Sequence, residues 1–438
     1  MDGARYVTPD DDFTGILREI DEGETIYLSR GYHTIDSPIR CDVDYVTITG
    51  EGINNTTIRQ TGDFPVLELV GTQRRGDRRS NWKVTDVTFK SQKGNTTDLV
   101  RAQYGGQHHF ERVRFECIDS LGNGVYAEEC WDVRFNNCRF SNGGDPDEET
   151  ADVYLYNGDY DMSNSIRFTN CTWDPVASHA IYSDSSGKGK INDRLYLVNC
   201  KFRGFGRGGR IKEDPEKYYV DGLWKWMKII NSHFNWSIKG FIRNQAGGQA
   251  VQVANCSFQQ YGETALDLAS DDNLVSGNIF ESKRAASTAI RSRGRQTTIM
   301  GNRIADHGGI RISGDSTSVH GNTVTGPDRT GIALDADGCL VTGNRIISPG
   351  RHGILMTGES TVVSSNTCIE PATTGIRFED ARYCIATENL VRSAGERGIE
   401  SVGDSDYLLV DSNVDVYSTA TDVELAGTNN EVGIHLGN

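Results

Sequence analysis

The chain has no long apolar run. In its 438 residues, no stretch approaches the roughly 18 consecutive apolar residues that a membrane-spanning helix needs. The opening residues, Met-Asp-Gly-Ala-Arg, lack the apolar core of a secretion signal. We therefore expect no membrane insertion and favour an intracellular or virion-assembled protein. A secreted enzyme expressed without its leader would have the same sequence features.

Basic residues are few, and lysine is scarcest among them. Acidic residues number 61 against 45 basic ones, only 12 of which are Lys, and the formal net charge is −16. No basic stripe is present to neutralise phosphates, which excludes nucleic acid as a partner. An acidic surface with Arg in place of Lys is typical of extreme halophiles, because carboxylates keep a surface hydrated in concentrated salt. An ordinary acidic mesophilic protein is the alternative.

Paired cysteines and linkers are also missing. The ten Cys do not have the spacing of a small disulfide framework, so we expect free thiols. No linker interrupts the chain, and the simplest organisation is a single domain. Within it, residues 1–60 form an N-terminal cap and first coil, and residues 61–438 form a solenoid whose loop-rich functional coils lie at about 120–245.

What the sequence does contain is a repeat. A phrase such as Phe135-Asn-Asn-Cys138-Arg-Phe140 or Ile299-Met-Gly-Asn302-Arg-Ile304 returns every 20 to 33 residues from Val87 onward. A second phrase, such as Gly331-Ile-Ala-Leu334, alternates with it. Both alternate apolar and polar residues between turn residues, which predicts short strands.

The period predicts an all-β fold, a right-handed single-stranded parallel β-helix with a short N-terminal capping helix over 11–20. Leucine-rich repeats share the period, but their Leu-x-x-Leu-x-Leu frame is absent. The column of asparagines from 278 to 413 predicts a buried ladder of side-chain amides between coils. The preceding cysteine column predicts small apolar side chains facing inward.

With these features the chain resembles the pectate-lyase-like superfamily of right-handed β-helices. The succession Gly23-Glu-Thr-Ile-Tyr-Leu28, Gly31-Tyr-His-Thr-Ile35 and Val46-Thr-Ile-Thr-Gly-Glu-Gly52 is similar to the start of many members, including virus tailspikes. Together with the acidic composition, the resemblance implies a protein of a haloarchaeal virus or its host. It implies a fold, whereas function must come from a site.

The longest coils indicate where that site lies. Aligning the second phrase gives inward Val125, Val153, Ile181 and Ile211, continuing to Ile242 and Leu266. The outward neighbours then form a groove in which aromatic rings and charges contact sugar. We expect the following residues to bind substrate: Tyr126, Tyr154, Tyr156, Tyr182, Arg210, Lys212, Trp224, Arg243 and Asp267. Tyr218 and Tyr219 also belong to the longest loop and are expected to wall the groove. The alternative is that outward tyrosines only stack to stabilise the sheet.

Catalysis would need two carboxyl groups about 5 Å apart for retention, or about 6.5 to 9.5 Å apart for inversion of configuration. Asp184 and Asp214 on adjacent coils suit the first spacing, and Glu128 with Asp184 suits the second. Asp159 and Asp161 are substitutes for either, and His179 is placed to orient an acid. The sequence leaves these pairings open.

Two enzyme families of this fold offer partial motif matches. Arg210-Ile-Lys212 is similar to the Arg-Ile-Lys motif of polygalacturonases, and Ser178-His-Ala180 lies one coil earlier, but their Asp-Asp and Asn-Thr-Asp motifs are missing. Pectate lyases of this fold use calcium and an Arg as the base, so with Arg243 present lyase activity remains an alternative. Asp335-Ala-Asp-Gly338 looks like half of a calcium loop without its Glu. We expect no cofactor, with calcium as the exception to test.

Three functions remain open. The favoured one is a receptor-binding or tailspike-like protein on a virion surface that binds, and trims, host cell-surface glycans. Because its final coil, ending at Gly433-Ile-His-Leu436, leaves a strand edge open, we expect a homo-oligomer, as a trimer, or contact with other virion components. The second is a free, secreted hydrolase, lyase or epimerase acting on acidic glycans. The third is a structural virion spacer.

Overall fold

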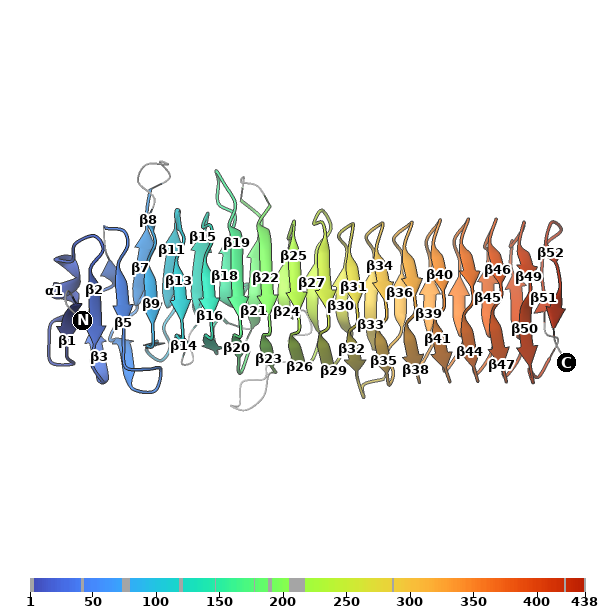
Figure 1. The fold of residues 1–438 in the computed structure, drawn as a ribbon, viewed down its shortest axis with the longest axis horizontal. Coiled ribbons are helices and arrows are strands. Elements are labelled where there is room, and N and C mark those ends of the chain that lie inside the picture. Colours follow the sequence, from blue (N-terminus) through green and yellow to red (C-terminus); the bar gives the residue numbers. More distant parts are fainter. Residues whose placement is uncertain are drawn as a thin grey trace. The chain divides into compact units, whose positions relative to one another are not determined.

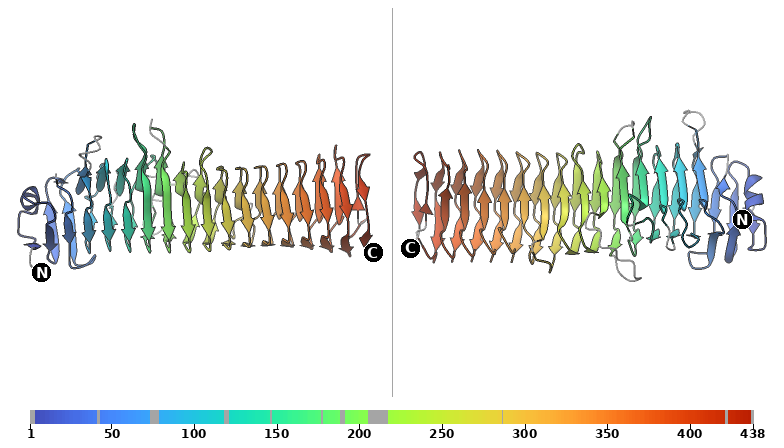
Figure 2. Two further views of the ribbon diagram at one scale, coloured as in Figure 1. Left: turned by 45° about the horizontal axis from the view of Figure 1, so that its top comes forward. Right: turned by 180° about the vertical axis from the view of Figure 1, so that it is seen from behind.

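The computed structural model of the chain describes residues 4–40, 43–72, 79–117, 121–145, 147–176, 178–187, 191–204, 217–285, 287–420 and 423–436. They form two compact units, residues 1–236 and 237–438. Each unit is a right-handed parallel β-solenoid, which confirms the predicted fold class. Figures 1 and 2 show how each coil contributes one strand to each of three sheets.

In the first unit the strands of each sheet pair in parallel with those of the preceding and following coils. Sheet A contains β1 (Ala4–Val7), β2 (Thr25–Leu28), β5 (Thr47–Thr49), β9 (Lys83–Thr85), β13 (His109–Glu111), β16 (Arg134–Asn136), β19 (Asn164–Thr169), β22 (Asp193–Val198) and β25 (Met227–Ile230). Sheet B contains β3 (Gly31–Ile35), β6 (Thr56–Gln60), β10 (Thr88–Lys90), β14 (Arg114–Glu116), β17 (Arg139–Ser141), β20 (Thr172–Trp173), β23 (Lys201–Arg203) and β26 (His233–Ser237). Sheet C contains β4 (Ile39–Arg40), β7 (Leu67–Val70), β11 (Val100–Gln103), β15 (Val125–Glu128), β18 (Ala151–Tyr156), β21 (His179–Asp184) and β24 (Tyr218–Gly222). The short strands β8 (Arg79–Ser80) and β12 (Gly105–Gly106) pair with each other and directly precede β9 and β13 of sheet A.

The second unit repeats the same three sheets with shorter strands. Sheet A contains β28 (Val251–Ala254), β31 (Leu274–Ser276), β34 (Thr298–Met300), β37 (Ser318–His320), β40 (Leu340–Thr342), β43 (Val362–Ser364), β46 (Ile385–Thr387), β49 (Leu409–Asp411) and β52 (Glu431–Val432). Sheet B contains β29 (Ser257–Tyr261), β32 (Ile279–Glu281), β35 (Arg303–Ala305), β38 (Thr323–Thr325), β41 (Arg345–Ile347), β44 (Thr367–Ile369), β47 (Leu390–Arg392), β50 (Asn413–Val416) and β53 (His435–Leu436). Sheet C contains β27 (Gly240–Asn244), β30 (Thr264–Leu268), β33 (Thr288–Ser292), β36 (Ile310–Ile312), β39 (Ile332–Leu334), β42 (Ile354–Met356), β45 (Ile376–Glu379), β48 (Ile399–Val402) and β51 (Val423–Glu424).

The predicted capping helix is present as α1 (Phe13–Arg18), shorter than the expected 11–20. The Asp12 carboxylate caps it by accepting from the Gly15 backbone N–H at 2.9 Å, which satisfies one of the free donors of the first turn. Phe13 and Leu17 are buried on the face that packs toward β3 and β4.

Aromatic columns fill the core of the first unit. Residues in register on successive coils point inward together, so identical side chains stack. Phe115 and Phe140 stack at 4.8 Å between ring centroids, and Phe202 and Phe234 stack at 4.4 Å. Trp173 lies within the same column, 4.8 Å from Phe140.

The turn from sheet A to sheet B explains why the repeated phrase has an Asn or Gly before its special position. That residue has a left-handed backbone in each coil, for example Asn137 at φ 54°, Asn170 at φ 55° and Gly301 at φ 61°. Glycine and asparagine adopt this conformation at the least cost. The repeated phrase therefore combines a residue that forms the turn with the next residue, which faces the core.

The special position itself is buried, as predicted. In the second unit the side chains of Asn278, Asn302, Asn322, Asn344, Asn366, Asn389 and Asn413 form a continuous ladder. Asn344 Nδ2 donates to Asn366 Oδ1 at 3.0 Å and to the Val319 carbonyl at 2.8 Å. In the first unit, buried cysteines such as Cys138 and Cys171 take the position. All nine cysteines that the structure describes are free thiols.

Replacing one rung of the ladder should destabilise the protein. Asn344→Ala removes the side-chain donor to Val319 and Asn366. It also removes the Oδ1 that accepts from the Asn322 backbone N–H and from Asn322 Nδ2, although Nδ2 still donates to the Ile299 carbonyl. We expect a loss of about 2 to 4 kcal/mol in the free energy of unfolding, measured by urea denaturation. The adjacent Arg345→Ala, on the exposed side, should change it by less than about 0.5 kcal/mol. Equal effects of the two changes would contradict a structural ladder.

Candidate functional site

The outward face of sheet C in the first unit carries a row of tyrosines. Register places Arg101, Tyr126, Tyr154 and Tyr182 side by side on β11, β15, β18 and β21. Inward Val125, Val153 and Ile181 are buried in the same strands, as the sequence predicted. The strands β18 and β21 have six residues each, so they extend farther than the three-residue strands that are common in the second unit.

The tyrosine rings lie against one another. The centroids of Tyr126 and Tyr154 are 5.7 Å apart with the planes at 15°, and those of Tyr154 and Tyr182 are 5.4 Å apart at 47°. The Arg101 guanidinium lies over the other face of Tyr126, 5.7 Å from its centroid. Because the ring faces cover each other, the row offers mainly ring edges and hydroxyl groups to solvent.

A carboxylate accompanies the hydroxyl of each central tyrosine. Tyr126 Oη donates to Glu128 Oε2 at 3.1 Å, and Tyr154 Oη donates to Asp184 Oδ2 at 2.6 Å. Tyr104 Oη donates to Glu128 as well, at 3.0 Å. Burial, together with these anions, raises the pKa of Tyr126 and of Tyr154, so both phenols remain protonated donors at any physiological pH.

Glu128 and Asp184 lie in one row on either side of Tyr156, two strands apart. This spacing is the one predicted from the sequence, about 9.6 Å between Cα atoms at the usual distance between strands. Neither carboxylate has an ion pair with a described residue.

The fourth coil of this face departs from the sequence alignment. Ile181 and Tyr182 pair with Val220 and Asp221 of β24, so Val220 holds the inward position that was predicted for Ile211. That prediction is wrong, because the loop after β23 is longer than the alignment assumed. Arg210, Lys212 and Asp214 lie outside the described residues. Asp221, which the alignment missed, takes the place beside Tyr182 expected for a lysine.

A second correction concerns the aromatic wall. Trp224 is completely buried, as are Tyr218 and Tyr219, so none of the three can contact a ligand on the surface. The Tyr219 ring packs near Phe202, with 6.4 Å between the ring centroids. Trp226, 52% exposed, is the aromatic residue of this segment that reaches solvent.

A charged cluster lies at the end of the row, around Tyr182. The His179 ring stacks on the Tyr182 ring at 4.8 Å, and its Nδ1 is 2.7 Å from the Tyr218 carbonyl oxygen. The other ring nitrogen lies 3.5 Å from Glu149 Oε2. Lys217 Nζ is 3.3 Å from Glu149 Oε1 and donates to the Glu148 carbonyl at 2.9 Å.

The electrostatics of the cluster centre on Glu149. Its interaction with His179, followed by the charges of His179 and Lys217, lowers the pKa of Glu149 to about 2. The 3.5 Å contact with His179 Nε2 is too long to satisfy that nitrogen as a hydrogen bond. His179 and Lys217 are buried, whereas the Glu149 side chain is mostly exposed.

The remaining predicted residues are spread out. Asp159 is exposed and Asp161 is half-buried in the turn after β18, where Asp161 accepts from the Met162 backbone N–H. Arg243 and Asp267 belong to the second unit, where they pair in register on β27 and β30. Asp267 is buried there and accepts from the Arg293 guanidinium at 2.9 Å. It therefore belongs to an ion pair of that unit.

Among the described residues, no three His, Cys, Asp or Glu side chains form a group that could hold a metal ion. Asp335 and Asp337, from the half calcium loop, instead accept hydrogen bonds from Thr357 and Glu359 of the next coil. In the described segments, no helix combines the length and apolarity needed to cross a membrane.

Comparison with known proteins supports the fold. Residues 242–415 match the family model described as "Right handed beta helix region". No curated protein matches the chain. The match covers fewer than half of the residues, and it falls in the regular second unit.

Solved structures similar to the chain include two viral proteins and one enzyme. ORF18 of Geobacillus virus E2 is 14% identical, with 95% of this chain and 54% of that chain covered and a TM-score of 0.36. Tailspike protein 3 of bacteriophage CBA120 is 12% identical, with 93% and 56% covered and a TM-score of 0.30. The periplasmic alginate epimerase AlgG is 10% identical, with 99% and 83% covered and a TM-score of 0.34. The chain thus spans about half the length of the two viral proteins. Similarity at this level carries no argument about function, which must come from the site.

The acidity of Glu149 predicts a pH-dependent contribution to stability. Its pKa of about 2 in the folded protein lies below the usual 4.5, so the stabilisation is complete above about pH 4.5 and is lost as the pH falls toward 2. Glu149→Gln should therefore lower the free energy of unfolding at pH 7 and have a progressively smaller effect below pH 4.5. Urea denaturation at pH 7, 5 and 3.5 measures this. A constant difference at all three values would contradict the ion-pair account.

Proposed function

We propose that the outward face of β15, β18 and β21 binds a hydroxyl-rich glycan. The observation that carries this proposal is the alternation of phenol and carboxylate groups along one row of strands in register. Carboxylates accept hydrogen bonds from sugar hydroxyls, and phenols both donate and accept them. Because the strands repeat at about 4.8 Å, the same groups recur along the face, which suits a polymer rather than a single sugar.

The charges on this face favour neutral segments of a glycan over uronates. The cations expected beside Tyr182 are replaced by Asp221, and Glu128 and Asp184 add negative charge without an ion-paired partner among the described residues. Like charges without an intervening cation repel one another. Lys217, the buried cation near Tyr182, is already paired with Glu149, which also contacts His179.

Hydrolysis is a second candidate, supported by the row of Glu128 and Asp184. The two residues lie two strands apart, with about 9.6 Å between their Cα atoms, and the Asp184 side chain is half-buried. This spacing is near the 6.5 to 9.5 Å that separates the carboxyl groups of an inverting glycosidase, in which one acts as acid and the other activates water. Asp221, opposite Tyr182 on the next strand, is completely buried and cannot contact a sugar on this face. Lyase or epimerase chemistry would also need a cation for the uronate carboxylate, and the described residues of this face offer none that is not already paired.

The biological setting is the most specific part of the proposal. A stacked coil that presents its binding groups sideways suits a receptor-binding or tailspike-like protein on a virion surface, assembled as a homo-oligomer. A secreted glycan-active protein would use the same face. In the structural-spacer alternative, Tyr126, Tyr154 and Tyr182 would be covered by a neighbouring subunit.

Glycan binding can be tested with an array of cell-surface polysaccharides, screened in both low and molar salt. Wild type should bind at least one glycan, and the double change Tyr154→Phe and Asp184→Asn should weaken that binding about tenfold or more, because it removes one donor and one charged acceptor. Tyr383→Phe, at an exposed tyrosine of the second unit that also stacks on a tyrosine, is the matched control.

The same screen separates the two functions. Release of reducing ends that is lost in Asp184→Asn and in Glu128→Gln would identify a hydrolase, whereas retained binding without release would identify a binding protein. If no glycan binds in either salt, or if the double variant binds as well as wild type, the proposed face is wrong.

A further inference from the structure

A small pocket lies in the second unit, where three successive coils turn from sheet B into sheet C. The turns follow β32, β35 and β38, so equivalent segments stack to form the pocket wall. About 310 Å³ of space, including the open mouth, is enclosed by Ser287, Thr288, His307, Gly309, Arg311, Pro327, Asp328, Arg329 and Thr330. Because this figure includes open solvent, the enclosed space is small and suits one chemical group rather than a whole oligosaccharide.

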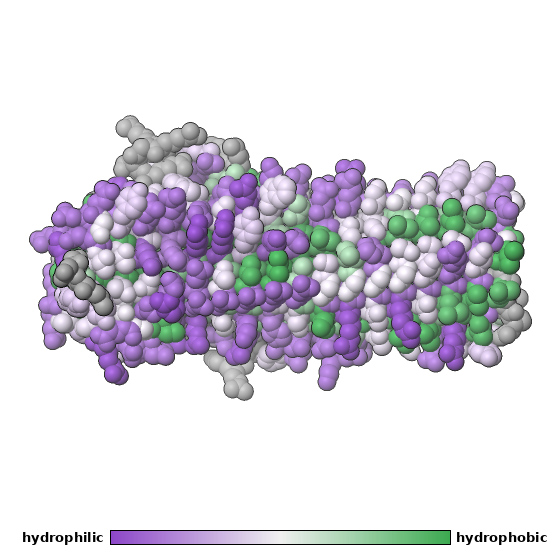
Figure 3. All heavy atoms as spheres, in the orientation of Figure 1, coloured by the Kyte–Doolittle hydropathy of each residue, from purple (hydrophilic) through white to green (hydrophobic). Residues whose placement is uncertain are grey.

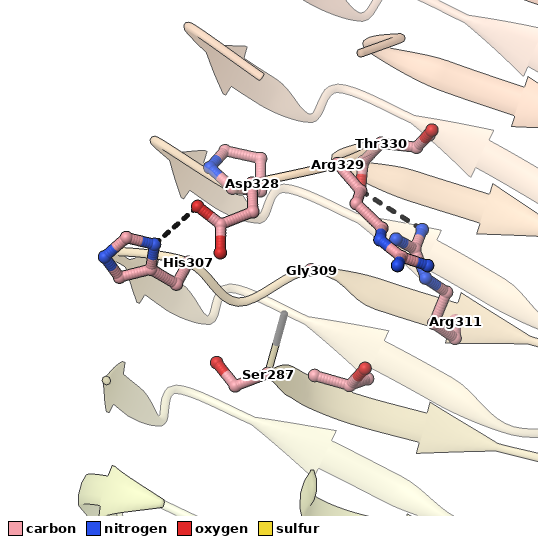
Figure 4. Close-up of a pocket in the computed structure, with 9 residues that line it drawn as sticks. Ser287, His307, Gly309, Arg311, Asp328, Arg329 and Thr330 are labelled. Atoms are coloured by element: carbon pink, nitrogen blue, oxygen red, sulfur yellow. Dashed lines mark hydrogen bonds and ion pairs between the residues drawn. The ribbon is translucent and has the colours of Figure 1, made fainter. Parts of the chain in front are cut away.

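Positive charge gathers in this pocket. Arg311 and Arg329 lie side by side in Figure 4, and Arg291 is the in-register neighbour of Arg311 on β33. Burial, followed by the charges of Arg329 and Arg291, lowers the pKa of Arg311. Three guanidinium groups thus crowd together in a chain whose net charge is −16.

The nearby carboxylates do not neutralise Arg311. Its Nη1 donates to the Thr330 carbonyl oxygen at 3.1 Å, and no ion pair joins it to a described acidic residue. Asp328 turns toward His307, with 2.5 Å between its Oδ1 and the ring Nδ1 (Figure 4). Asp267 accepts from Arg293 at 2.9 Å and lies 3.8 Å from Arg291.

A buried hydroxyl provides an independent sign of a missing ligand. Ser287 is only 6% exposed, lines the pocket, and its Oγ has no hydrogen-bond partner among the described residues. The Tyr261 hydroxyl lies nearby, since Ser287 offsets part of the rise that burial causes in the pKa of Tyr261, but neither oxygen meets the geometry of a hydrogen bond. A buried polar group without a partner is costly, and an acceptor placed in the pocket would remove that cost.

We infer that this pocket binds an oxyanion, the carboxylate or sulfate group of an anionic saccharide. Arg311 and Arg329 supply the charge and a planar array of donors, and Ser287 supplies a hydroxyl donor at the floor. Gly309 has no side chain to fill the floor of the pocket. Ala333, which is in register with Arg311 on β39, has only a methyl side chain and leaves room beside Arg311. The site is separate from the tyrosine face and would recognise the charged groups that the face disfavours.

The test is titration calorimetry with simple anions at constant low ionic strength, adjusted with chloride. Inorganic sulfate and D-galacturonate are the two probes, and D-galactose is the uncharged control. Wild type should bind at least one of the two anions and not galactose. Arg311→Met and Arg329→Ala should each weaken that binding about tenfold or more, and Ser287→Ala should weaken it by a smaller factor. Arg345→Ala, another exposed arginine of the same unit, should leave binding unchanged.

The outcomes separate the possible sources of the anion. Binding of galacturonate identifies a carboxylate site, and binding of sulfate alone identifies a site for a sulfate ester. Absence of binding to both anions would overturn the inference, as would equal affinity in wild type, Arg329→Ala and Arg345→Ala. Because Arg329 is exposed, its variant should fold even if Arg311→Met does not. Tyr154→Phe should bind the anions normally, so failure here and failure of the glycan face are distinguishable.

Discussion

The hydrogen bonding of each coil to the next, in parallel and in register, is the constraint on which the structure depends. It gives each side chain the same neighbours on the coils before and after it, so one favourable choice of residue is repeated along a column. Phe115, Phe140 and Phe202 belong to one such column, and the asparagines from Asn278 to Asn413 form another. The columns stabilise the coil because stacked rings bury apolar surface and amide ladders give buried polar groups their hydrogen-bond partners.

The same constraint shapes the outer surface. Tyr126, Tyr154 and Tyr182 form a row because their strands are in register, and each turn of the pocket around Arg311 has its equivalent one coil away. Hydrophilic residues cover most of the visible face of the first unit in Figure 3, while hydrophobic patches occur on the second, where Leu340, Leu390 and Leu409 are exposed. The two units therefore offer different chemistry: a phenol and carboxylate face in one, and a cationic pocket in the other.

Much of this could be predicted from the sequence wherever the period is visible. The Asn column, the inward Val125, Val153 and Ile181, and the outward tyrosines follow from counting residues, because each coil contributes a fixed number of core positions. Counting failed in the fourth coil of the tyrosine face. There the sequence Arg210-Ile-Lys212 has the alternating pattern of a strand, whereas β24 begins at Tyr218 and puts Val220 in register with Ile181. The alternating pattern of Tyr219 and Asp221 around Val220 was the available signal.

Other features had no signal in the sequence. Glu149 and Lys217 are 68 residues apart and neither belongs to a repeated phrase, so counting residues along the repeat could not bring them together. Trp224 was predicted to face solvent because aromatic residues in a long loop suggest a binding wall, yet burial of its ring stabilises the core more than exposure would. The cationic pocket could not be predicted either, since Arg311 and Arg329 come from different coils and only the stacking of the coils brings them together.

The central claim is that the tyrosine row of the first unit is where a glycan binds. Hydroxyl-radical footprinting, read by mass spectrometry with and without a bound surface polysaccharide, tests this most directly. The account predicts that the glycan protects Tyr154 and Tyr182 from oxidation while exposed Tyr383 and Tyr407 are labelled as before. Unchanged labelling of Tyr154 and Tyr182 under saturating glycan, with protection elsewhere, would contradict it.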